Sequence, residues 1–183
     1  MFTDARSKKV VLVAHCILNQ NAKMDRCAFY PGAVREVSEM LVAAGVGLLQ
    51  MPCPELLCFG LAREADPAIE PTIGEEDTRI ARRLHDADAQ ATCRRLVDDL
   101  VYQVEEYAQN GFEVIGILGM NGSPSCAVEL TWYEDAAHPE PGQFVAMLRD
   151  ALADRGFVIP MAGIRANEPE AAVHTVEALL ARV

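Results

Sequence analysis

Three cysteines of this chain occupy matched positions in the sequence. Cys16 and Cys53 each come two residues after a run of aliphatic residues, and Cys126 stands in the loop behind a third such run. A thiolate is a ligand for soft metals and a nucleophile. A free cysteine usually packs as a small apolar side chain. Three of them at equivalent points, in loops rich in Pro, Gly, Ser and Asn, favour a shared site instead.

The elements that position these cysteines follow from the hydrophobic pattern. Short β-branched runs predict buried parallel strands over residues 9–14, 46–51, 113–118 and 157–160. Helices are predicted from Pro31-Gly32 to Gly45, over 75–109 with a break near 85–88, over 142–154 and over 168–180. Residues 52–74, rich in Pro and Gly, are expected to form a long functional loop.

This alternation of strands and helices predicts an α/β fold. We expect residues 1–183 to form one domain, a three-layer α/β/α sandwich with a central, mostly parallel, Rossmann-like sheet. Ligands of such sheets bind outside the carboxyl ends of the strands. Thiols that follow three neighbouring strands would therefore meet at one edge of the sheet.

Composition narrows the class of partner. The chain has 183 residues, of which 51% are apolar, and a net charge of −11 without a basic face, which argues against nucleic acid and anionic membranes. No apolar run approaches the roughly 18–20 residues that cross a bilayer. The first apolar run contains His15 and is interpreted as a strand, not as a secretion signal. We therefore expect a cytoplasmic protein, a monomer or a homodimer, whose cysteines are not structural disulfides.

The thiols could hold a metal or act singly. The chain has no CxxC pair, and structural zinc normally takes four ligands, so an iron–sulfur cluster with one open iron fits three cysteines better. A single nucleophile, such as Cys16 beside His15, is the alternative, but neighbours on a strand point to opposite faces. Of the remaining cysteines, Cys27 can approach the site, Cys58 is a bystander or accessory ligand, and Cys93 is expected in the core.

Three motifs of the chain resemble the 2-thiouracil desulfidase (TudS-like) family, and more closely a TudS-related subgroup of desulfidases. The motifs are His15-Cys16-Ile17-Leu18-Asn19, Cys53-Pro54-Glu55 and Asn121-Gly122-Ser123-Pro124-Ser125-Cys126. The resemblance covers nearly the whole chain. It implies a 4Fe–4S cluster on Cys16, Cys53 and Cys126, whose fourth iron takes the sulfur of a small thiolated heterocycle. The carbon–sulfur bond is then replaced by carbon–oxygen, and sulfide leaves.

The same resemblance implies that Glu55 is the acid/base and that Ser123 and Ser125 line the pocket. By their own chemistry, a partly buried Glu55 can exchange a proton near neutral pH or simply face water, and the serines can be turn residues or donors. The other candidates for binding substrate are Asn19, Asp25, Asn121 and Gly122, with Lys23 and Arg63 as cations and Trp132 as a stacking surface or packing residue.

Two departures from the family pattern bear on the substrate. Ala127 follows the third cysteine where the family usually has Gly, and the first motif continues as Asn19-Gln20-Asn21-Ala22-Lys23 instead of a Gly-rich segment. Both put thiouracil itself in question as the natural substrate. Two further functions stay open, namely a cluster- or zinc-holding binding or sensing domain without catalysis, and a single-cysteine hydrolase.

Overall fold

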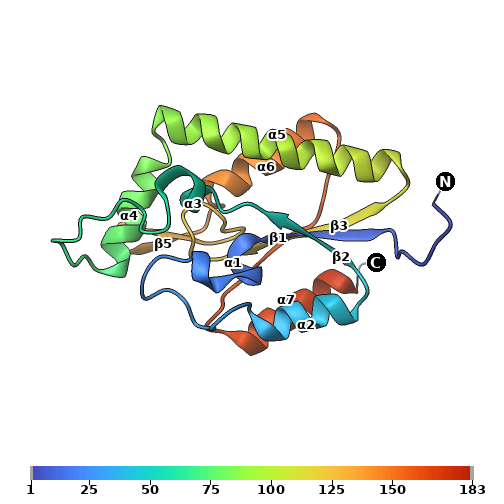
Figure 1. The fold of residues 1–183 in the computed structure, drawn as a ribbon, viewed down its shortest axis with the longest axis horizontal. Helices are drawn as coiled ribbons and strands as arrows, with labels where there is room; N and C mark the ends of the chain where they lie inside the picture. Colours follow the sequence, from blue (N-terminus) through green and yellow to red (C-terminus); the bar gives the residue numbers. More distant parts are fainter. Residues whose placement is uncertain (1, 182–183) are drawn as a thin grey trace.

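One parallel sheet runs through the molecule (Figure 1), and the computed structural model describes residues 2–181. The strands are β1 (Lys9–Ala14), β2 (Gly47–Met51), β3 (Glu113–Met120) and β6 (Met161–Ile164). Their order is β2-β1-β3-β6, and every neighbouring pair is parallel. The predicted α/β class with a central parallel sheet is confirmed.

Helices cover both faces of this sheet. On one face α5 (Ala87–Gln109) packs beside α6 (Gln143–Asp154), and on the other α2 (Arg35–Ala43) packs beside α7 (Pro169–Leu180) (Figure 1). The remaining elements gather at the carboxyl ends of the strands (Figure 1). They are α1 (His15–Leu18), the 3₁₀ helix η1 (Gln20–Ala22), α3 (Pro54–Phe59), α4 (Ile73–Arg83), β4 (Thr131–Tyr133) and β5 (Ala136–His138). Within residues 2–181, no helix has both the length and the hydropathy that a membrane span requires.

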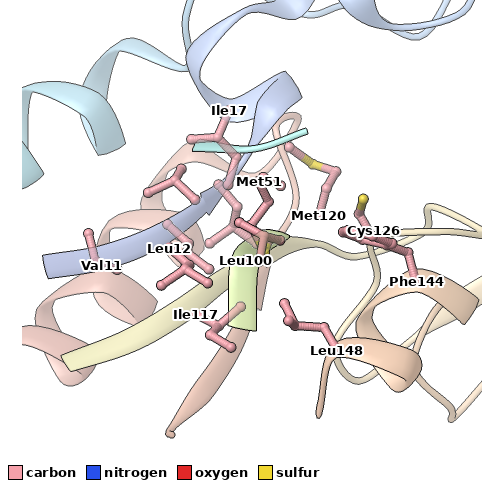
Figure 2. Packing of buried hydrophobic residues seen from close by; sticks show 14 of the residues in the cluster. Val11, Leu12, Ile17, Met51, Leu100, Ile117, Met120, Cys126, Phe144 and Leu148 are labelled. Atoms are coloured by element: carbon pink, nitrogen blue, oxygen red, sulfur yellow. The ribbon is translucent and has the colours of Figure 1, made fainter. Parts of the chain in front are cut away.

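The core explains why the central strand is continuously apolar. Leu12 of β1 and Ile117 of β3 have no exposed surface, because helices cover the sheet on both sides. Leu100 of α5 and Leu148 of α6 belong to the same hydrophobic cluster as Leu12 and Ile117 (Figure 2). Burying each such side chain contributes about 1.5–3 kcal/mol. The buried core beneath the carboxyl edge of the sheet is therefore rigid.

Two sequence predictions were wrong in position. The segment 52–74 was expected to be a loop, but it begins with α3, whose first residue is Pro54. The fourth strand was expected at 157–160 and lies at Met161–Ile164. Pro160 has no N–H to donate to a neighbouring strand, and pairing with β3 begins at the next residue.

Other boundaries agree closely with the pattern. The predicted break in the long helical region separates α4, which ends at Arg83, from α5, which begins at Ala87. The helix expected from Pro31-Gly32 begins at Arg35 instead. The β4–β5 hairpin was not predicted, because its two strands have three residues each and show no clear alternation.

Candidate functional site

The three matched cysteines meet at one cavity. Cys16 lies in α1, directly behind β1, Cys53 precedes α3, behind β2, and Cys126 lies in the loop behind β3. Since β1 lies between β2 and β3, the three thiols leave the same edge of the sheet. All three line a cavity of about 310 Å³, at the small end of the roughly 300–1,000 Å³ common for ligand sites. The site lies where strand order reverses, as expected for this topology.

Burial governs the state of these thiols. It raises the pKa of Cys16 to about 11 and the pKa of Cys53 to about 12. It also raises the pKa of Cys126 well above its ordinary value, and Cys53 and Cys16, when ionised, add to that rise. The three sulfur atoms therefore lie within electrostatic reach of one another. Without a bound cation they are neutral thiols at pH 7, and ionising them together requires positive charge among them.

Local structure fixes the direction of two of the three cysteines. The sulfur of Cys53 accepts a hydrogen bond from the backbone N–H of Leu56 at 3.5 Å, at the beginning of α3. Around Cys126, the Oγ of Ser123 accepts the backbone N–H groups of Ser125 and Cys126 at 3.2 and 3.1 Å. Gly142 packs so closely on this turn that an added Cβ would lie 2.5 Å from the carbonyl carbon of Ser125.

A carboxylate is held beside the thiols by a full set of donors. Ser125 Oγ donates to Glu55 Oε1 at 2.6 Å, Ser123 Oγ donates to the same oxygen at 3.2 Å, and Arg63 Nε donates to Oε2 at 3.3 Å. Glu55 is 9% exposed, so these donors replace water around its charge. The predicted trio of Glu55, Ser123 and Ser125 is thus brought together, although Glu55 comes from α3 and the serines from the loop behind β3.

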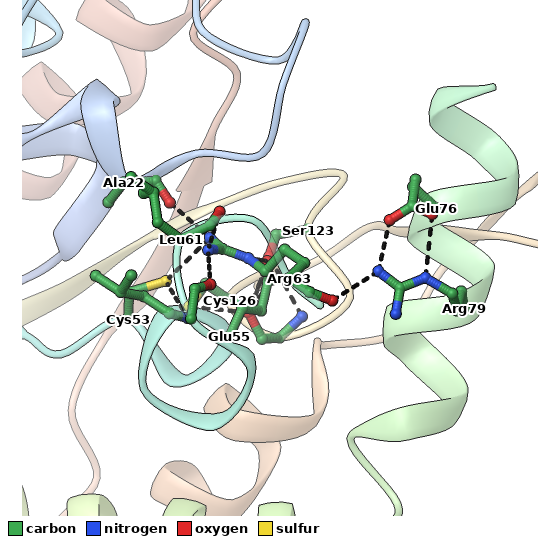
Figure 3. Close-up of polar contacts among 12 residues, drawn as sticks. Ala22, Cys53, Glu55, Leu61, Arg63, Glu76, Arg79, Ser123 and Cys126 are labelled. Atoms are coloured by element: carbon green, nitrogen blue, oxygen red, sulfur yellow. Dashed lines mark hydrogen bonds and ion pairs between the residues drawn. The ribbon is translucent and has the colours of Figure 1, made fainter. Parts of the chain in front are cut away.

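Arg63 organises this network from behind (Figure 3). Its side chain is 2% exposed and donates to the backbone oxygens of Ala22, Gly60 and Leu61 at 2.5, 2.8 and 3.2 Å. Its Nη2 also approaches the sulfur of Cys53 at 3.8 Å. Arg63 was expected to bind an acidic substrate. The structure commits its donors to the protein instead, so it supports Glu55 and the first cysteine loop.

The geometry gives no activated Cys–His pair. The ring of His15 contacts the side chains of Gln50 at 2.7 Å and Asn19 at 3.5 Å. The strand ends at Ala14, as predicted, and His15 and Cys16 lie in the short helix α1, which the sequence did not predict. A nucleophilic thiol normally has a lowered pKa, whereas the pKa of Cys16 is raised by burial. A hydrolase that uses Cys16 has no support from this arrangement.

The predicted substrate-binding residues divide into two groups. Asn121 and Gly122 line the cavity, but the side chain of Asn121 is committed to its own loop, donating to Glu129 at 2.8 Å and accepting from Val128 N at 3.1 Å. Asn19 and Asp25 do not line it. Asn19 caps η1 by accepting the N–H of Asn21, and the Asp25 side chain is 95% exposed.

Three other predicted features have a clear outcome. Cys93 is buried in the core, as expected, and half-buried Cys58 donates to the carbonyl oxygen of Ala89, away from the cavity. Cys27 lines the cavity. Ala127 has no positive φ and does not line the cavity, so its methyl group costs nothing in backbone strain and leaves the pocket surface unchanged.

Among the cavity residues that sequence reasoning missed is a carboxylate, Asp77. It lies on α4 and lines the cavity together with Ile73, Lys23 and Trp132. Ile73 and Asp77 are four residues apart, which places them on the same face of a helix. This spacing would have identified Asp77 only if the cavity beside the helix had been known, and the sequence did not reveal the cavity.

A single metal ion has no ready site here. Among residues 2–181, no group of three or more His, Cys, Asp or Glu side chains is arranged to hold one ion. A cluster differs, because its protein sulfurs bind separate irons and lie roughly 6–7 Å apart, given metal–sulfur bonds of about 2.3 Å. Three soft donors that line one cavity and act electrostatically on one another fit such a group by donor chemistry and topology, and a fourth thiol, that of Cys27, lines the same cavity.

Comparison with known proteins gives one relative. The Uncharacterized protein MJ0003 of Methanocaldococcus jannaschii is 31% identical over 123 residues, which cover 67% of this chain and 70% of that protein. No protein-family model matches the chain. No solved structure matches it either.

Proposed function

We propose that this chain, which belongs to the same family as the Uncharacterized protein MJ0003 of Methanocaldococcus jannaschii, is an iron–sulfur-dependent desulfidase. Its substrate would be a small thiolated heterocycle of the thiouracil kind. The observation that carries the proposal is the convergence of Cys16, Cys53 and Cys126 on one cavity beside Glu55. The resemblance of the three motifs to the TudS-like family supports the same reaction.

The three thiolates would hold a 4Fe–4S cluster at the inner end of the cavity. When bound, the cluster supplies one iron without a protein ligand, a soft Lewis acid suited to a thiocarbonyl sulfur. The chain contributes the setting of this group. Burial beneath the loops that carry Cys53 and Cys126 limits access of water and oxygen, and neighbouring Arg63 offsets part of the negative charge that three thiolates bring.

Glu55 is suited to move the proton that the reaction requires. Replacing sulfur by oxygen adds one water to the C=S carbon and releases H₂S, so a proton must leave the water and reach the departing sulfur without any oxidant. A carboxylate oxygen of Glu55 takes the water proton and returns it to the sulfur. Ser123 and Ser125 hold Oε1, and Arg63 holds Oε2, so the carboxylate keeps one orientation throughout.

Anaerobic reconstitution with iron and sulfide tests the proposal. The wild-type protein is expected to develop the broad absorption of a 4Fe–4S cluster and to release sulfide from 2-thiouracil. Cys16→Ala, Cys53→Ala and Cys126→Ala should each abolish cluster uptake. Cys58→Ala, which lies outside the cavity, should load normally. Glu55→Gln should load normally but release sulfide roughly 10²–10⁴-fold more slowly.

Three results would contradict the proposal. A wild-type protein that never takes up iron excludes the cluster. Iron uptake without sulfide release from any thiolated base favours a binding or sensing domain. Full activity after chelation, with one labelled low-pKa cysteine, favours a hydrolase.

A further inference from the structure

The outer half of the cavity holds two charged side chains whose role the proposed reaction does not explain. Asp77 lies on α4, Lys23 directly follows η1, and both line the cavity. Among residues 2–181, neither side chain makes a hydrogen bond or an ion pair within the protein. Polar groups that line a cavity and lack a protein partner are the ones available to a ligand.

The other charged groups of the cavity are already engaged. Both oxygens of Glu55 accept protein donors, as described above. Arg26 donates to the carbonyl oxygen of Pro71, and Arg165 pairs with Glu168 at 3.1 Å. Arg63 is committed to the backbone and to Glu55. Asp77 is therefore the carboxylate of this cavity that is free to accept a hydrogen bond from substrate.

The position of Asp77 is fixed by the way α4 is anchored. Thr72 and Glu75 form a reciprocal capping box at the beginning of α4. Farther along α4, Arg79 donates to the backbone oxygen of Arg63 at 2.8 Å and pairs with Glu76 at 2.7 Å (Figure 3). The capping box and the Glu76 pair stabilise the helix itself, and the bond to Arg63 holds its backbone beside the cavity that Asp77 lines.

The surroundings of Asp77 suit the edge of a flat ring. Ile73 lies one turn before it on the same face of α4, and Trp132 from β4 lines the cavity close to that end of the helix. Together they provide apolar surface for a ring face. Burial, with a smaller contribution from the charge of Glu55, raises the pKa of Asp77 to about 7, although the charge of Lys23 acts in the opposite direction. A carboxyl that is so poorly hydrated gains from a donor supplied by a ligand.

We infer that Asp77 is the specificity-determining residue of this site, accepting a hydrogen bond from a ring N–H adjacent to the thiocarbonyl group. The inference rests on the proposed function for the presence of a thiocarbonyl. It goes beyond that function by naming the edge of the substrate that the protein reads, which is an N–H donor beside C=S. Thiolated lactams and thioureas with a free N–H belong to this class, whereas fully N-substituted rings do not.

Trp132 supplies a binding readout that is independent of turnover. It is the one tryptophan of the chain and it lines the cavity. Its fluorescence, excited at the red edge of indole absorption, should be quenched by a ring in the outer half of the cavity. Cluster-loaded protein is titrated with 2-thiouracil and with 1,3-dimethyl-2-thiouracil, which lacks both N–H groups, while sulfide release is measured on the same samples.

The expected result is a change in discrimination between the two probes. A hydrogen bond to a charged group contributes enough for wild type to bind 2-thiouracil roughly tenfold more tightly than the dimethyl probe. Asp77→Ala should reduce this affinity ratio to about one, chiefly by weakening the binding of 2-thiouracil. The affinity ratio of Asp77→Asn should lie between those of wild type and Asp77→Ala. Asp98→Ala removes an exposed carboxylate on α5 and should leave the ratio unchanged.

The outcomes separate the inference from the function on which it rests. Sulfide release with an unchanged ratio in Asp77→Ala overturns the role of Asp77 and leaves the desulfidase proposal standing. Saturable quenching that loses its discrimination in Asp77→Ala, but without sulfide release by wild type, supports recognition by Asp77 and overturns the reaction. Absence of saturable quenching by either probe in wild type overturns the inference outright.

Discussion

Replacing Arg63 by Met is expected to cost more stability than any surface substitution of this protein. The guanidinium is 2% exposed and donates to three backbone oxygens and to Glu55. Met fills much of the same volume but donates nothing. It leaves Glu55 with its negative charge in a buried setting and the carbonyl oxygen of Ala22 without this donor.

The magnitude follows from the burial of the pair. Removing one partner of a buried ion pair costs about 3–5 kcal/mol, and total stabilities are about 5–15 kcal/mol. Arg63→Met should therefore remove about a fifth or more of the free energy of unfolding. Arg63→Lys keeps the charge but not the forked geometry, so it should cost less, about 1–3 kcal/mol. The double variant with Glu55→Gln should be less destabilised than the sum of the singles, by about 1–3 kcal/mol.

Urea unfolding followed by circular dichroism measures these values at constant pH and salt. The matched control is Arg155→Met, which removes an ion pair to Glu105 whose arginine side chain is 57% exposed. Such a pair contributes less than about 1 kcal/mol. The reasoning is refuted if Arg63→Met loses no more stability than Arg155→Met, or if the double variant is strictly additive.

Two further predictions address other parts of the site. Because the pKa of Asp77 is raised to about 7 in the fold, its proton is bound more tightly in the folded than in the unfolded chain, so stability present below about pH 4 is lost as the pH rises through 7. Asp77→Asn lacks this loss. Its free energy of unfolding should therefore exceed that of wild type by about 1–2 kcal/mol at pH 8, a value reduced to account for partial access of water, and should equal that of wild type at pH 3.5. Equal differences at both pH values would exclude the raised pKa of Asp77. Gly142 has an ordinary φ of −64°, but a Cβ there would lie 2.8 Å from the backbone N of Cys126. Gly142→Ala should therefore displace the Cys126 turn, lower the free energy of unfolding by about 1–3 kcal/mol and impair iron uptake. The control Gly32→Ala places its methyl group in open space and should have none of these effects. Normal iron uptake by Gly142→Ala would show that the turn adapts.

Much of the fold could be predicted from the sequence, because it depends on local patterns of apolar residues. The aliphatic runs before Cys16 and Cys126 are buried on both sides of the sheet, as a continuous apolar segment indicates, whereas the run before Cys53 forms the edge strand β2 and only its last residue, Met51, is buried. Alternation with helices then allows only a few topologies, and parallel neighbours bring their carboxyl ends together. The grouping of the three thiols could therefore be predicted before any contact was known. The exact limits of β6 could not, because Pro160 and its neighbours are decided by pairing with β3.

The sequence determined which residues could do chemistry, and tertiary structure decided which of them are free to do it. Arg63 and Asn121 have the right side chains for binding substrate, yet both are occupied by backbone groups of loops that fold against them. Asp77 carries no signal in its neighbourhood of the chain, and it becomes a candidate only because α4 is anchored beside the cavity. Hydrogen-bond capacity is set by residue type, but its use depends on partners distant in sequence, and only the folded chain brings those partners together.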